Sequence, residues 1–73
     1  MDIKKFKLKF EKEIEKKIDL NKNFLKNGID SLDLISMVMI LEKELNIKIL
    51  EGQLSKVTNF QELEKLIKKI KKA

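Results

Sequence analysis

The chain has 73 residues, a formal net charge of +5, and neither cysteine nor histidine, so we expect a single domain over residues 1–73 with one small core. The two missing residue types exclude a disulfide framework, a zinc site ligated by histidine or thiolate, and a nucleophile activated by histidine. We therefore do not expect an independent enzyme, because a chain of this size also offers little room for a deep pocket.

All 17 basic residues are lysines, and they are concentrated at the two ends of the chain. Residues 1–22 carry a net charge of +3 and residues 56–73 a net charge of +4, whereas residues 23–55 carry −2. Arginine provides the planar fork favoured for base and phosphate recognition, so its absence weakens a nucleic-acid interpretation. With no run of 18 apolar residues and no signal-peptide pattern at the N-terminus, we expect a cytoplasmic protein without stable membrane insertion.

The first segment predicts a helix that continues to Ile18. Its apolar residues recur at spacings of three and four and form one stripe: Ile3, Phe6, Phe10, Ile14 and Ile18. Residues 19–28 contain three asparagines and Gly28, which favour turns over helix. The apolar residues of this long loop, Leu20, Phe24 and Leu25, are expected to pack back on the core.

Residues 31–45 predict the central helix, with Ser31 as its N-cap and Asp33 in the first turn, where a carboxylate complements the helix dipole. If Ile35 lies on the buried face, that face also contains Val38, Leu41, Glu42 and Leu45, with Leu34 at its edge. The opposite side then presents Leu32, Ser36, Met39 and Lys43. This stripe is either a surface for a partner or is covered by other helices, and the pattern does not decide between the two.

The remainder of the chain predicts one short helical turn near residues 51–56 and a last helix. Thr58 with Gln61 and Asn59 with Glu62 both match the capping-box spacing at the start of that helix. The inward-facing residues are expected to be Ile47, Ile49, Leu54 and Val57, followed by Phe60, Leu63, Leu66, Ile67 and Ile70. The predicted fold is therefore all-α, a small bundle of three main helices plus one short helix, with a long loop between the first two.

Ser31 has a possible role beyond capping. The N-terminus of a helix is a ready site for a phosphate, because its first backbone N–H groups are free and the helix dipole favours negative charge. An exposed serine hydroxyl at that position could carry a phosphodiester. Physical chemistry alone leaves both roles open.

The stretch Gly28-Ile29-Asp30-Ser31-Leu32-Asp33, followed by residues 34–49, resembles the attachment-site helix of acyl carrier proteins, and Val57-Thr58 matches the usual opening of that family's last helix. The resemblance implies that Ser31 receives 4′-phosphopantetheine from coenzyme A through a phosphopantetheinyl transferase. The arm would supply the thiol that this cysteine-free chain lacks. The protein would then be a monomeric carrier that holds acyl groups as thioesters and presents them to acyl-transferring and acyl-modifying enzymes of fatty-acid, lipid or related biosynthesis.

The resemblance also implies a docking surface around the attachment serine. By position it contains Asp30, Leu32, Asp33, Ser36, Met39, Glu42 and Lys43. Typical fatty-acid carriers are strongly acidic, whereas this chain is basic, and Ser36 and Lys43 occupy positions where the family commonly has acidic residues. The protein is therefore either a divergent housekeeping carrier or a specialised one that serves its own set of enzymes.

Three alternatives stay open from the sequence. An aminoacyl or peptidyl carrier of a specialised pathway would share the fold and the arm but bear a different cargo. The lysine-rich ends motivate a basic helical nucleic-acid-binding module, which would bind with a strong salt dependence. The amphipathic last helix motivates peripheral membrane binding through Leu63, Leu66, Ile67 and Ile70.

Overall fold

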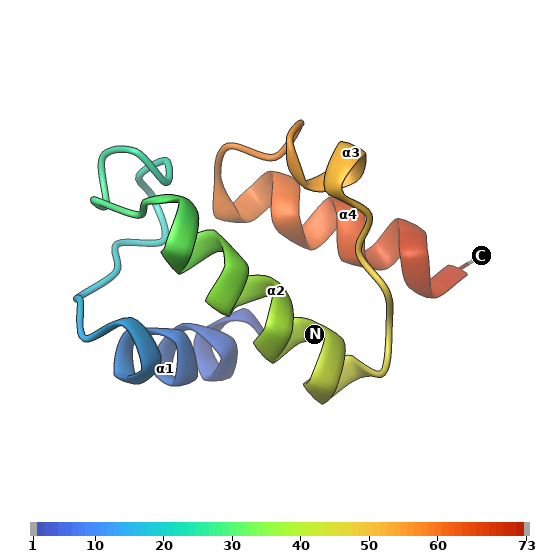
Figure 1. Ribbon diagram of the computed structural model, residues 1–73, viewed down its shortest axis with the longest axis horizontal. Helices are drawn as coiled ribbons and strands as arrows, with labels where there is room; N and C mark the ends of the chain where they lie inside the picture. Colours follow the sequence, from blue (N-terminus) through green and yellow to red (C-terminus); the bar gives the residue numbers. More distant parts are fainter. Residues whose placement is uncertain (1, 73) are drawn as a thin grey trace.

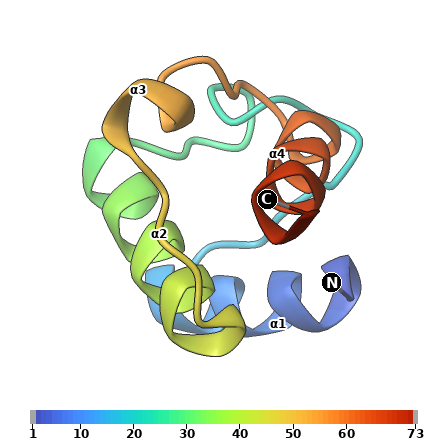
Figure 2. The same ribbon diagram turned by 90° about the vertical axis from the view of Figure 1, so that its right-hand side faces the viewer.

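The computed structural model describes residues 2–72, and within this range the chain forms four α-helices and no strand. They are α1 (Ile3–Ile14), α2 (Ser31–Leu45), the single-turn α3 (Glu51–Leu54) and α4 (Phe60–Lys72) (Figure 1). The predicted all-α bundle of three main helices and one short one is confirmed, and α2 has the predicted bounds. Figure 2 shows α1, α2 and α4 arranged around a common centre.

The end of α1 differs from the prediction. Glu15 adopts the left-handed conformation (φ 57°) and ends the helix after Ile14, so the expected extension to Ile18 is wrong. Ile18 is nevertheless buried, because the loop turns back and its backbone N–H donates a 2.6 Å hydrogen bond to Oε2 of Glu11. The apolar spacing thus identified a core residue although the backbone that carries it is not helical.

The buried face of α2 also differs from the prediction. Met37 and Leu41 are its fully buried apolar residues, whereas Ile35, which we expected inside, has 55% of its surface exposed. Leu41 was also expected inside and is buried, and Leu34, Val38 and Leu45 are partly buried against the core, as expected. The prediction is therefore wrong mainly at Ile35, whose place is taken by Met37, about 200° away around the helix. The sequence allows this error because the segment from Leu34 to Leu41 is almost wholly apolar and has little periodicity.

The long loop between α1 and α2 is tied to the start of α4. The Phe24 N–H donates to the Thr58 carbonyl at 2.9 Å, and the Phe24 ring meets the Phe60 ring edge-on with centroids 4.9 Å apart. Phe24 is buried and Leu20 partly buried, as expected. Leu25 was also expected to pack inward, but 84% of its surface is exposed.

Asn59 provides the side-chain cap of α4. Its Oδ1 accepts a 2.8 Å hydrogen bond from the Glu62 N–H, and Oε1 of Glu62 accepts from the Thr58 N–H at 2.9 Å and from the Thr58 hydroxyl at 2.6 Å. These bonds lower the pKa of Glu62. The predicted pairing of Thr58 with Gln61 is wrong, because the Gln61 amide donates instead to the Leu20 carbonyl at 3.1 Å.

The core joins all three long helices to the long loop between α1 and α2 and to the short loop between α2 and α3. The buried apolar side chains are Phe6, Phe10, Ile18, Phe24, Ile29, Met37, Leu41, Ile49, Phe60, Leu63 and Ile67. Six of these eleven residues lie outside α1 and α4, and they attach α2 and the loops on either side of it to the bundle. The core therefore fixes the position of the N-terminus of α2, where Ser31 lies.

Candidate functional site

Ser31 is the first residue of α2 and is exposed. The helix is capped by its neighbours instead: Oδ1 of Asp30 accepts from the Asp33 N–H at 2.9 Å, and Oδ2 of Asp33 accepts from the Asp30 N–H at 3.2 Å. This reciprocal pair is a capping box, so the prediction that Ser31 is the N-cap is wrong. Within residues 2–72 the Ser31 hydroxyl has no hydrogen-bond partner, which leaves it available for chemistry.

The turn that leads into Ser31 is held by its own polar groups. Gly28 has a φ of +73°, a conformation that side chains rarely adopt. The Asn27 side chain accepts from the Asp19 N–H at 2.8 Å and donates to the carbonyls of Asp19, Lys22 and Asn23 at 3.0–3.1 Å. A loop bonded in this way presents the start of α2 in a defined orientation.

Lys16 links the end of α1 to this turn. Its Nζ donates to Oδ2 of Asp33 at 2.6 Å and to the Gly28 carbonyl at 2.7 Å. The hydrogen bond from Lys16 holds the pKa of Asp33 below its usual range against the opposing effect of burial, and the same bond raises the pKa of Lys16. Sequence reasoning missed Lys16, because nothing distinguishes it from the other lysines of residues 1–22.

An exposed apolar surface continues from Ser31 along α2. Leu32, Ile35 and Met39 have 73%, 55% and 65% of their surfaces exposed, and we call these three residues the apolar row. Leu32 and Met39 were expected on the outer face, whereas Ile35 was not. No other helix within residues 2–72 covers the apolar row.

The seven residues predicted to form a docking surface do not share one face. Asp30 and Lys43 are exposed and Ser36 is half-buried, so these three flank the apolar row formed in part by Leu32 and Met39. Asp33 is turned inward, with only 9% of its surface exposed, and is bound to Lys16. Glu42 is half-buried, and its Oε2 accepts a 2.9 Å hydrogen bond from the Ile49 N–H. Two of the three acidic residues of the predicted docking surface, Asp33 and Glu42, are thus used inside the protein.

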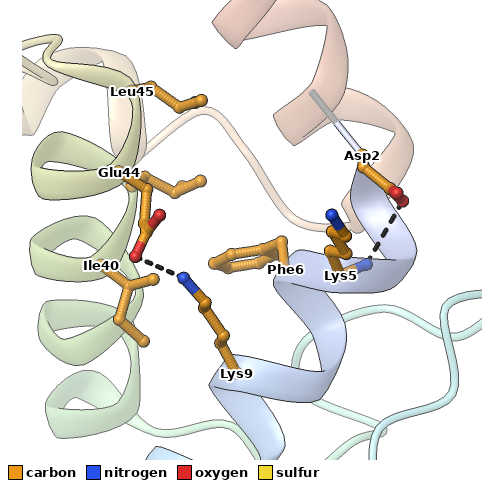
Figure 3. A pocket seen from close by; sticks show the side chains of 8 residues that line it. Asp2, Lys5, Phe6, Lys9, Ile40, Glu44 and Leu45 are labelled. Atoms are coloured by element: carbon orange, nitrogen blue, oxygen red, sulfur yellow. Dashed lines mark hydrogen bonds and ion pairs between the residues drawn. The ribbon is translucent and has the colours of Figure 1, made fainter.

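A small hollow lies between α1 and α2, toward the C-terminal end of α2 and away from Ser31 (Figure 3). It has a volume of about 190 Å³, and Phe6, Ile40 and Leu45 form much of its apolar wall. Lys9 of α1 reaches across to Glu44 of α2, and this ion pair lowers the pKa of Glu44. Because residues 40–45 lie roughly 15–20 Å along the helix from Ser31, this hollow is separate from the Ser31 site.

Comparison with known proteins agrees with the geometry. The fold matches the crystal structure of an acyl carrier protein from Thermotoga maritima with a TM-score of 0.79 and 30% sequence identity, over 96% of this chain and 87% of that one. Residues 8–67 match the family model described as a phosphopantetheine attachment site. The chain belongs to the acyl carrier protein family. A comparison of this carrier protein with curated proteins gave no match.

The group that attaches to carrier proteins of this family is 4′-phosphopantetheine, and the residues at the start of α2 fit it. The Ser31 hydroxyl is exposed, and within residues 2–72 the backbone N–H groups of Ser31 and Leu32 have no hydrogen-bond partner. Free N–H groups and the helix dipole favour a phosphate at this end of α2. The site therefore combines an exposed serine hydroxyl with a local environment suited to negative charge.

Proposed function

We propose that this carrier protein holds acyl intermediates as thioesters on 4′-phosphopantetheine attached to Ser31, and presents them to enzymes of fatty-acid, lipid or related acyl biosynthesis. The proposal rests on one observation at the start of α2: the residues that cap the helix are not the serine that would be modified. Asp30 and Asp33 close the helix, so the exposed Ser31 hydroxyl is free to form the phosphodiester. The bound group supplies the thiol, which the chain itself lacks. The protein acts as a carrier and as the substrate of a phosphopantetheinyl transferase.

The proposed docking surface is the apolar row with its exposed neighbours Asp30 and Lys43. Because Asp33 and Glu42 are bound within the protein, this surface offers more apolar contact than negative charge. Electrostatic complementarity mainly accelerates encounter and selects partners. We therefore propose that the partner enzymes recognise this carrier through an apolar pocket and need not present a strongly basic patch.

The structure argues against peripheral membrane binding through the apolar stripe of α4. Leu63 and Ile67, central to the apolar stripe of α4, are fully buried in the core and cannot face a lipid surface. None of the helices within residues 2–72 is both long enough and apolar enough to cross a bilayer.

The test of the attachment site is the intact mass after incubation with coenzyme A and a broad-specificity phosphopantetheinyl transferase. We expect one added phosphopantetheine on the wild type and none on Ser31→Ala. Ser55→Ala is the matched control, because Ser55 is also exposed but caps α3 through a 3.0 Å bond to the Gly52 carbonyl. It should be modified like the wild type. No mass gain with several transferases, or a gain that persists in Ser31→Ala, would refute the proposal.

The modified protein then allows the cargo to be identified. Loading with acyl donors in preference to aminoacyl donors is the expected result for an acyl carrier. The reverse preference would indicate the aminoacyl or peptidyl carrier instead.

A further inference from the structure

Lys16 contacts the segment that presents Ser31 on both sides of the serine. Its ammonium group donates to the Gly28 carbonyl, three residues before Ser31, and to the Asp33 carboxylate, two residues after it. An ammonium group has three protons to donate. The Lys16 ammonium donates two of them, one to each side of the turn. A single side chain thereby bridges the loop and the first turn of α2.

The backbone of Lys16 is itself held in place. Glu15 takes the left-handed conformation at the end of α1, and the N–H groups of Glu15 and Lys16 both point to the Glu11 carbonyl, the latter at 3.3 Å. Two residues later the Ile18 side chain enters the core. The backbone of Lys16 is therefore fixed, and its side chain extends to the turn from a defined position.

The carboxylate that Lys16 binds also belongs to the cap of α2. Oδ2 of Asp33 accepts from both Lys16 Nζ and the Asp30 N–H. The bond network thus runs from α1 through Lys16 and Asp33 to Asp30, the residue that immediately precedes Ser31. Movement of the lysine would release the turn and the cap together.

We infer that Lys16 is a positioning residue for the modification of Ser31, which fixes the N-terminus of α2 so that the serine hydroxyl meets the transferase in one orientation. The inference rests on the proposed function. Lys16 itself need not touch the coenzyme or the transferase. Its contribution is geometric, and misplacing a reacting atom by about 1 Å can reduce a rate by as much as about 100-fold.

The experiment measures initial rates of phosphopantetheine transfer at varied carrier concentration for Lys16→Gln and Lys17→Gln. Both variants remove one positive charge from the same segment. Lys17 is exposed, and its side chain makes no hydrogen bond or ion pair within residues 2–72, so it controls for charge. We expect Lys16→Gln to lower kcat by about 10-fold with a nearly unchanged KM, and Lys17→Gln to stay within about two-fold of the wild type.

Further variants separate positioning from loss of stability. All rates are measured well below the unfolding temperature of each variant. Lys16→Arg, which keeps the charge and the donors, should recover most of kcat. In Lys16→Gln the amides of Asp30 and Asp33 should exchange hydrogen faster than in the wild type, while those of α4 should not. Lys16→Gln should have a smaller effect in an Asp33→Asn background than in the wild type, because one of the two bonds of Lys16 is made to Asp33.

The outcomes distinguish this inference from the proposed function. A wild type that is modified at Ser31 together with a Lys16→Gln variant of unchanged kcat overturns the positioning role alone. Equal losses in Lys16→Gln and Lys17→Gln, or a change confined to KM, also overturn it, because they indicate charge or docking. A wild type that is not modified overturns both.

Discussion

Two adjacent residues at the start of α2 have different tasks. Asp30 accepts the hydrogen bond that closes the first turn, and Ser31 directs its hydroxyl to solvent. Aspartate and serine are equally good N-caps, so the sequence Asp-Ser gives no means of ranking them. In the structure the cap is Asp30, because Asp33 lies three residues after it and its carboxylate accepts the reciprocal hydrogen bond from the Asp30 N–H.

This division predicts unequal effects on stability at the two positions. Asp30→Ala should lower the free energy of unfolding by about 1 kcal/mol, the usual cost of losing an N-cap. Ser31→Ala should change it by less than about 0.5 kcal/mol, as for an exposed residue without partners. Urea unfolding followed by circular dichroism measures both. Equal losses, or a larger loss for Ser31→Ala, would indicate that Ser31 contributes to the cap and would contradict this assignment.

At the scale of elements, the orientation of α2 decides which apolar residues hold the fold and which are available to partners. Met37→Ala removes a fully buried side chain and should cost about 2–5 kcal/mol of stability. Ile35→Ala should cost less than about 0.5 kcal/mol but should weaken docking to a partner enzyme. Chemical denaturation measures the first effect and transferase KM the second. A large loss of stability in Ile35→Ala would support the orientation predicted from the sequence.

The elements differ in how far the sequence could predict them. The bounds of α2 follow from the cap residues before it and the asparagine after it, which adopts the left-handed conformation. The orientation of α2 does not, because Leu34 to Leu41 is apolar on nearly every side. The end of α1 was missed because the left-handed residue there is Glu15 and not glycine, and only contacts with the rest of the fold select that conformation.

The site itself was predictable only in part. The motif around Ser31 predicts the attachment residue through the resemblance, and the outward positions of Leu32 and Met39 follow from helical spacing. The inward position of Asp33 does not, because its partner Lys16 is 17 residues away in sequence and is one of eight lysines in residues 1–22. Contacts between distant residues of this kind have no periodicity and cannot be found from one sequence.

Across the whole molecule, the carboxylates with shifted pKa values connect separate parts of the bundle. Asp33 joins α2 to the end of α1, Glu44 joins α2 to the middle of α1, and Glu62 joins the cap of α4 to the preceding loop. Each has a pKa below its usual value because of its hydrogen-bond donors. The ionised form of all three is therefore favoured by folding.

These shifts predict the pH dependence of stability. A group whose pKa is lowered by folding stabilises the protein above its usual pKa, 3.8 for Asp33 and 4.5 for the two glutamates, and this stability is lost as the pH falls through the lower folded value. Lys16, whose pKa is raised, stabilises the protein below 10.5 and loses that effect as the pH rises further. We expect the midpoint of urea unfolding to be level near neutrality and to fall below about pH 4.

Asp33→Asn tests the connection between α2 and the end of α1. The variant should be less stable than the wild type at pH 7 and should lose less stability than the wild type between pH 5 and pH 2. Asp19→Asn is the control, because within residues 2–72 the Asp19 carboxylate bonds only to the nearby Asn21 N–H. Asp19→Asn should lose as much stability as the wild type between pH 5 and pH 2. Parallel pH profiles for Asp33→Asn and the wild type would show that Asp33 does not contribute.

The cap made by Asp30 has a consequence for how such a protein can evolve. Because the helix is closed without Ser31, Ser31→Ala should cost little in folding, and under the proposed function selection on this position acts mainly through modification. One substitution would turn the carrier into an unmodified but intact domain. Its exposed apolar row would persist, so a descendant that had lost the prosthetic group could still bind the enzymes that its ancestor served.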